Sequence, residues 1–402
     1  MSNRATAPQA SASRLCAAAI EVDRNLARMD RKVDWLTRLT PTNVDEIWAG
    51  FQASGFREMP DSQFGEGLIN DAPGLREELF ALPVREIENP LIQALLLEKQ
   101  REIDRQIELV RMRGLDGFII ASIDLFGHVS EQLLQTARDL LETVPILPPD
   151  PKDVGSDAIC EAARQTVAGY RKRHPDFSCE VIVDPTPGTS LYMAMGNFHV
   201  AFDFRTAHSR VAPLIEHEIG THAVTRYNGS RQPLHTLAGG LADYDVLQEG
   251  LAVLAEYLAG YLPASRLRTL AGRVVAVHMA VQESKGADIY ACLVEECRLD
   301  SATAFDTAVR AKRGGGLTKD ALYLKGLAEL LAYLSHDGDL QILFLGKFAL
   351  KQLHSLERLI QDGILHPPEI IPSYLQDHAA AERLARARTL SLEALYQESP
   401  ET

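Results

Sequence analysis

The sequence predicts a mainly helical α+β fold in which one small antiparallel sheet interrupts a long series of helices. Between residues 90 and 113, apolar residues recur every three, four or seven positions, the period of an amphipathic helix. Strand-like patterns occur between residues 179 and 204, and helical patterns then return up to residue 360. Helices, a few strands and further helices, in that order, define this class.

The first helical region spans residues 14–55 and contains one break. Pro41 ends the first helix, because proline lacks the amide hydrogen that a helix interior needs. Thr42 or Asn43 can then cap the next helix through a side-chain oxygen. The strongest helical pattern follows at 90–113 and ends before a glycine.

A cluster of prolines predicts a boundary between two parts of the chain. Residues 145–155 contain four prolines and end in a glycine, a composition that stops helices and stiffens a connection. The sequence therefore divides into four expected segments: a disordered tail over 1–13, a helical N-terminal subdomain over 14–150, a core that carries the chemistry over 151–378, and a helical, acidic C-terminal tail over 379–402.

Three short strands are expected early in that core, at residues 179–183, 191–195 and 198–204. Gly196 and Asn197 are suited to the turn between the second and third strands. In the third strand, aromatic and branched residues alternate with polar or small ones, which indicates one buried face.

Composition and charge restrict the possible partners and location. The 402 residues carry a formal net charge of -14, which disfavours nucleic acid because phosphate binding depends on clustered cations. No apolar run approaches the roughly 20 residues of a membrane span, and the first residues do not resemble a secretory signal. The five cysteines are scattered, as in a protein with reduced thiols. We therefore expect a cytoplasmic protein that binds neither nucleic acid nor membrane.

The most informative residues are His217, Glu218 and His222, which form a His-Glu-x-x-x-His pattern. Zinc peptidases normally separate the two histidines by four residues, so that both imidazoles lie on one helix face. A separation of five rotates the second histidine by about 140° on a regular helix. A local π-type turn would bring the imidazoles together again, and Gly220 permits such a departure. We therefore predict a bulged helix over 217–222.

Glu249 is the best candidate for a third ligand. It begins an apolar helical pattern, and the 27 residues after His222 suffice for a loop and a helix that packs back on the first. Two imidazoles and one carboxylate would bind one Zn²⁺ ion and leave the fourth tetrahedral position for water, as in catalytic zinc sites. Glu218 would act as general base toward that water.

Several nearby residues leave alternatives open. Glu256, Asp243 and Asp245 compete to orient a ligand imidazole through a hydrogen bond. Three further histidines close to the motif in sequence are expected to remain outside the site: His199, His208 and His235.

The stretches 217–229, 245–258 and 317–327, with a weaker match at 39–43, resemble the QEGLA-motif proteins, which are named for modulating flavohaemoglobin expression. That family is related to the microtubule-associated tyrosine carboxypeptidases of animals. The resemblance implies a zincin-like metallopeptidase fold with His217, His222 and Glu249 as zinc ligands and Glu218 as the catalytic residue. It also implies carboxypeptidase action on a peptide or protein.

A carboxypeptidase needs a cation for the terminal carboxylate of its substrate. The sequence leaves this residue open among five candidates: Arg205, Arg210, Arg226, Arg313 and Lys319. Tyr323 is a possible oxyanion donor, and the strand at 198–204 could pair with an extended substrate. The competing functions are a non-catalytic regulator that uses the zinc-site fold to bind a partner, and a hydrolase of another amide. The substrate, the oligomeric state and the endopeptidase alternative stay open.

Overall fold

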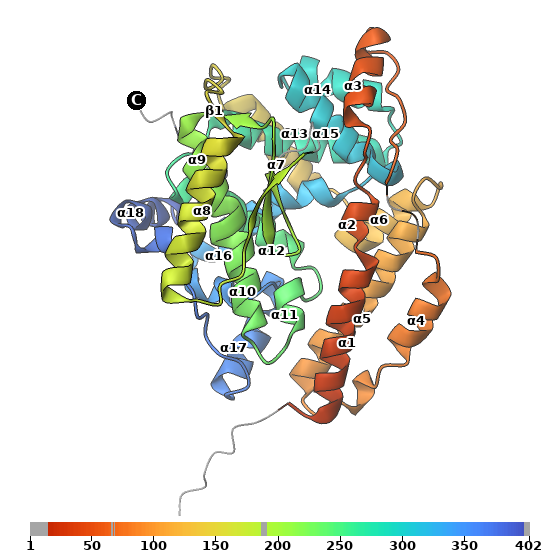
Figure 1. Cartoon of the computed structure of the whole chain (residues 1–402). Coiled ribbons are helices and arrows are strands. Elements are labelled where there is room, and N and C mark those ends of the chain that lie inside the picture. The colour runs from red at the N-terminus through yellow and green to blue at the C-terminus, as the bar shows by residue number, and fades with distance from the viewer. Residues whose placement is uncertain (1–14, 66, 68, 186–190, 398–402) are drawn as a thin grey trace, which may run out of the picture.

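The computed structural model describes residues 15–65, 67, 69–185 and 191–397 (Figure 1). The expected tail over 1–13 lies outside these residues, as does the end of the expected C-terminal segment beyond residue 397. Within the described ranges, no helix combines the length and apolarity needed to cross a membrane. Figure 1 shows α1 to α6 along one side of the molecule, and α17 and α18 on the opposite side.

Helices account for most of the described chain, and the predicted mainly helical α+β class is confirmed. The helices before the predicted boundary are α1 (Ala17–Val33), α2 (Trp35–Arg38), α3 (Val44–Ala53), α4 (Ala72–Phe80), α5 (Pro90–Arg111), α6 (Phe118–Phe126) and α7 (Glu131–Thr143). Those that follow are α8 (Ser156–Arg173), α9 (His208–Ile215), η2 (Glu216–Ala223), α10 (Val224–Ser230), α11 (Thr236–Gly239), α12 (Asp245–Leu258), α13 (Ala264–Val281), α14 (Gly286–Glu295) and α15 (Ser301–Lys312). The last group contains η4 (Lys319–Ala321), α16 (Leu322–Ser335), α17 (Leu353–Gln361) and α18 (His378–Ala387).

The break between α2 and α3 falls where the sequence placed it. Asn43 occupies the position before α3, but its side chain does not cap the helix. Its side-chain oxygen accepts a hydrogen bond from the Gln63 amide at 2.8 Å, and its side-chain nitrogen donates to the Asp61 carbonyl at 3.1 Å. Asn43 therefore fixes the loop that follows α3, which the sequence did not predict.

The main sheet has three strands, β2 (Val181–Asp184), β3 (Leu191–Ala194) and β4 (Asn197–Ala201), in the order β2-β4-β3. β4 pairs antiparallel with β3 but parallel with β2, so the expected antiparallel sheet is in fact mixed. The reason is the path of the chain, because β4 returns from the β3 edge into the middle of the sheet. A separate antiparallel pair joins β1 (Val154–Gly155) to β5 (Arg205–Thr206).

The β3–β4 turn is formed by Met195 and Gly196, one residue earlier than expected. Both residues have positive φ, 51° and 87°, and Ala194 pairs with Asn197 on either side of them. A two-residue turn of this kind matches the twist of paired strands. Asn197 is therefore the first residue of β4 and not part of the turn.

Helix α12 lies at the centre of the molecule, with every residue from Leu247 to Leu258 buried. It packs against η2 on one side and α16 on another, at a crossing where two glycines meet. A Cβ atom on Gly326 would lie only 1.9 Å from the Val246 carbonyl oxygen, and one on Gly250 only 2.4 Å from the Gly326 carbonyl carbon. The two backbones are therefore in direct contact, which brings η4, just before α16, close to the first turns of α12.

Candidate metal centre

The two motif histidines lie on η2, a π-helical segment between α9 and α10. The ring centroids of His217 and His222 are 5.3 Å apart, so both imidazoles lie on one side of the helix. This arrangement fits the wider π turn, in which residues five apart come into register. Gly220 makes room for the preceding turn, because a Cβ atom there would lie 2.1 Å from Oε2 of Glu216.

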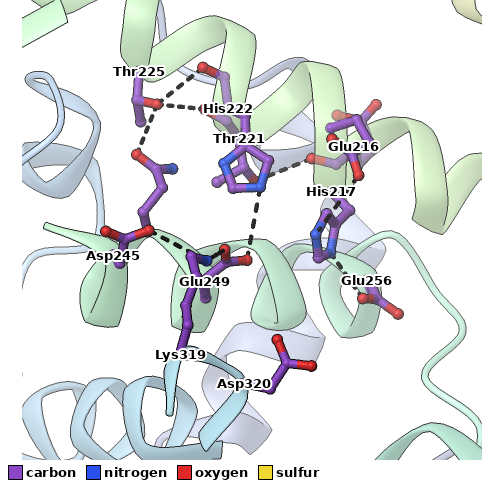
Figure 2. Close-up of polar contacts among 12 residues, drawn as sticks. Glu216, His217, Thr221, His222, Thr225, Asp245, Glu249, Glu256, Lys319 and Asp320 are labelled. Atoms are coloured by element: carbon purple, nitrogen blue, oxygen red, sulfur yellow. Dashed lines mark hydrogen bonds and ion pairs between the residues drawn. The ribbon is translucent and has the colours of Figure 1, made fainter. Parts of the chain in front are cut away.

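Glu249 of α12 faces the two histidines of η2 (Figure 2). The ligand atoms of these three residues all lie within 4.8 Å of one another, and no more than 13% of any of the three side chains is exposed. Tetrahedral zinc with bonds of about 2.0–2.2 Å separates its ligand atoms by about 3.4 Å. The donor set fits zinc after small side-chain movements, and the three predicted ligands are brought together.

Glu256, also on α12, orients His217. Its Oε1 lies 2.8 Å from Nδ1 of His217, which leaves Nε2 of that ring for the metal position. The two aspartates that the sequence left as alternatives are used elsewhere: Asp243 pairs with Lys351 at 2.6 Å and Asp245 with Lys319 at 3.3 Å.

Two arginines hold Glu256 in its ionised form. The Glu256 side chain is fully buried, with Arg210 2.5 Å from Oε2 and Arg266 3.1 Å from Oε1. Burial alone would raise the pKa of Glu256, but Arg266 and Arg210 hold it well below its ordinary value. The Nδ1 atom of His217 therefore faces a permanent anion, which favours a proton on Nδ1 and a free Nε2.

Lys319 of η4 supports the third donor from the opposite side. Its Nζ donates to Oε1 of Glu249 at 2.8 Å, while Oε2 of Glu249 faces Nε2 of His222 at 3.9 Å. Burial would raise the pKa of Glu249, but Lys319, with both histidines, lowers it to about 2. Burial also lowers the pKa of His222 well below its ordinary value, so that imidazole is neutral, as a metal ligand must be.

Glu218 lies beside the donor cluster and has no hydrogen-bond partner among the described residues. Its Oε1 is 3.9 Å from Nε2 of His217, and its carboxylate has no hydrogen bond to any residue in the described ranges. Burial raises the pKa of Glu218 to about 7. A carboxylate with that pKa can accept and return a proton near neutral pH.

Several other candidates from the sequence serve the scaffold. Arg205 donates to the backbone carbonyls of Lys152 and Asp153 at 3.2 Å each. Tyr323 lies beneath two cations, with its ring centroid 4.9 Å from Cζ of Arg273 and 5.4 Å from Nζ of Lys319. Burial raises the pKa of Tyr323.

Arg313 is a partly buried cation just after α15. Burial lowers the pKa of Arg313 to about 10, and its Nε has no hydrogen-bond partner. The three histidines expected outside the site do not join the donor cluster: His199 stacks on Tyr192, the His208 amide binds Asp153, and the His235 amide binds Asp23.

These features define a class: a mainly helical α+β protein in which two imidazoles and a carboxylate converge beside a second carboxylate that has no hydrogen bond within the described ranges. Residues 49–391 match the model of the family described as microtubule-associated tyrosine carboxypeptidase. The chain belongs to this family, and the predicted relationship is confirmed.

Curated relatives of the same name come from three mammals. Microtubule-associated tyrosine carboxypeptidase 1 of Mus musculus is 30% identical over 178 residues, which cover 41% of this chain and 36% of the relative. The Rattus norvegicus protein has the same identity and coverage, and the Homo sapiens protein is 29% identical over 177 residues with 41% and 36% covered. The match spans about a third of the length of these relatives.

Proposed function

We propose that this protein is a zinc-dependent peptidase of the carboxypeptidase type with a zincin-like active site. The observation that carries the proposal is the convergence of the ligand atoms of His217, His222 and Glu249 within 4.8 Å of one another, with the carboxylate of Glu218 beside them. Zinc, when bound there, would polarise the scissile carbonyl and make water more acidic. Membership of a family named for tyrosine carboxypeptidases supports the reaction type.

The protein's own residues can carry the proton transfers. Glu218 takes a proton from the attacking water, because its pKa of about 7 keeps part of the population ionised at neutral pH. The same carboxyl then returns that proton to the leaving amine. His217 keeps its orientation throughout, since Glu256 holds Nδ1 at 2.8 Å.

A non-catalytic regulator with the same fold is the competing function. A buried carboxylate that makes no hydrogen bond costs free energy. Glu216 also has a buried oxygen without a partner, so the position of Glu218, 3.9 Å from Nε2 of His217 and beside the expected ligands, is what favours the enzyme. The relatives are named for tyrosine, so the peptides tested should include some that end in tyrosine and matched peptides that end in other residues.

The test compares wild-type protein with Glu218→Gln. We expect one zinc per chain in both by elemental analysis, and loss of peptide release by about 10²- to 10⁴-fold in the variant, followed by mass spectrometry. Glu249→Ala should instead lose zinc. Wild-type protein without zinc, or Glu218→Gln with full activity, would refute the proposal.

A further inference from the structure

Two cations near the metal centre lack the anionic partners that neighbouring cations have. Lys319 is paired with Glu249, and Arg210 with Glu256. By contrast, Arg226 of α10 and Lys347, which follows η5 (Gln341–Phe344), form no ion pair with any residue of the described chain, although both are partly buried. Partly buried cations without anions are unusual, because removal from water must be offset by pairing.

Both cations are held firmly near η2. Arg226 lies four residues after His222, and its Nε is 2.5 Å from the position that a Cβ atom on Gly196 would take. The absence of a side chain at the β3–β4 turn therefore leaves space for the guanidinium. The backbone of Lys347 is fixed on both sides, since its amide donates to the Leu237 carbonyl at 2.8 Å and its carbonyl accepts from the Leu241 amide at 2.9 Å.

Lys347 interacts electrostatically with both Arg226 and the expected ligand Glu249. Its Nζ is 5.5 Å from the ring centroid of Tyr244, the residue just before α12. Burial lowers the pKa of Lys347 to about 8, and Arg226 contributes to this by repulsion. Lys347 also acts on His222 through its charge. Asp245, Glu249 and Asp30 act on Lys347 in the opposite direction, but none of them forms an ion pair with it. An anion that bound to both Lys347 and Arg226 would relieve the repulsion between these two cations.

We propose that Arg226 and Lys347 bind the α-carboxylate of the substrate and thereby select its C-terminal residue for removal. The proposal rests on the peptidase function proposed above. Guanidinium groups bind carboxylates through two parallel hydrogen bonds, and an ammonium group adds a point charge. Such recognition would exclude peptides whose carboxyl terminus is blocked.

The spacing suits removal of a single residue. In an extended peptide, one residue of about 3.3–3.6 Å separates the last scissile carbonyl from the terminal carboxylate. Arg226 in α10 follows His222 in η2 by about one helical turn. A carbonyl at the metal ligands and a carboxylate at Arg226 would therefore lie beside neighbouring turns.

The binding test uses zinc-loaded Glu218→Gln, which should bind substrate without cleaving it. Calorimetry would compare a short peptide ending in a free carboxylate, the same peptide as its C-terminal amide, and an amide with glutamate in the last position. We expect the free acid to bind about 10- to 100-fold more tightly than either amide. Adding Arg226→Gln or Lys347→Gln should reduce this ratio at least about fivefold. Lys351→Gln should not, because Lys351 is exposed and paired with Asp243.

The possible outcomes separate the two proposals. Equal binding of acid and amide by zinc-loaded protein overturns carboxylate recognition, even where wild-type protein cleaves peptides. Tight binding of the glutamate amide assigns the cations to a side-chain carboxylate and overturns selection of the terminus. Absence of peptide release by wild-type protein overturns the peptidase function alone, because the binding comparison does not require turnover. Zinc content and thermal unfolding of each variant confirm that it is folded.

Discussion

Replacing Glu256 with glutamine should weaken the metal centre although Glu256 is not expected to touch the metal. The carboxylate accepts from Nδ1 of His217 at 2.8 Å and orients the ring. Glutamine can keep this hydrogen bond but not the negative charge that strengthens it. Partners of this kind typically contribute 10- to 100-fold to metal affinity, so the zinc dissociation constant of Glu256→Gln should rise by about that factor, or about 1.4–2.7 kcal/mol.

The same substitution should destabilise the zinc-free protein by a separate route. Arg210 and Arg266, whose side chains are 12% and 19% exposed, would lose the buried anion they share. Removing one partner of a buried ion pair costs about 3–5 kcal/mol, and partial exposure of both arginines reduces this to about 2–4 kcal/mol. The free energy of unfolding in chelator should therefore fall by that amount.

Competition with a coloured zinc chelator measures the first effect, and urea unfolding in excess chelator measures the second. Glu329→Gln is a matched control, because Glu329 is 48% exposed and its pair with Lys325 is long, at 3.9 Å. That variant should change neither quantity by more than about 0.5 kcal/mol. Unchanged zinc affinity in Glu256→Gln would show that this carboxylate does not prepare His217 for the metal, and would refute the reasoning.

Two further predictions concern the stability of the helices that surround the candidate metal centre. Gly326→Ala should lower the free energy of unfolding by about 1–3 kcal/mol or more, because the added Cβ atom would lie 1.9 Å from the Val246 carbonyl oxygen. Gly169 on α8 has open space around it, so Gly169→Ala should leave the free energy of unfolding unchanged or raise it. Equal effects of the two variants would contradict the close crossing of α12 and α16. Burial raises the pKa of Glu216 to about 7 from an ordinary 4.5, so its contribution to stability is full below pH 4.5 and is lost as pH rises through about 7. In chelator, the free energy of unfolding of Glu216→Gln should therefore exceed that of wild type by about 3 kcal/mol at pH 8 and by little at pH 4.5. An identical difference at both pH values would show that the Glu216 carboxyl does not cause the pH dependence of stability.

Residues close together in the sequence could be predicted well. The five-residue spacing of His217 and His222 cannot place both imidazoles on one face of a regular α-helix, and the structure has π-helical geometry there. Glu249 was within reach because only a loop and one helix separate it from the motif. The choice of Glu256 over two aspartates could not be made, since it depends on how α12 rotates against η2.

The direction of neighbouring strands could not be predicted from the sequence for a different reason. Alternation of apolar and polar residues shows which face of a strand is buried, but it does not encode whether a neighbouring strand runs parallel or antiparallel. The expectation of an antiparallel sheet followed from the β3–β4 hairpin and is correct for that pair. It is wrong for β2, whose place beside β4 is decided by the path of the chain.

Lys319 and Lys347 show why the cations that bind the substrate could not be identified without the structure. Both lysines act electrostatically on His222 and on Glu249. The sequence named Lys319 as a candidate and missed Lys347, because nothing in the sequence indicates that residue 347 lies near the metal ligands. Lys319 already has its anion, because it lies 2.8 Å from Glu249 and 3.3 Å from Asp245, and it therefore belongs to the scaffold of the metal ligands. Lys347 forms no ion pair within the described ranges, although Asp245, Glu249 and Asp30 act on it through their charges, so its ammonium group can still pair with an anion that enters the site. A cation near a metal centre is a candidate for substrate recognition only when the scaffold has not already neutralised it, and that condition separates these two lysines.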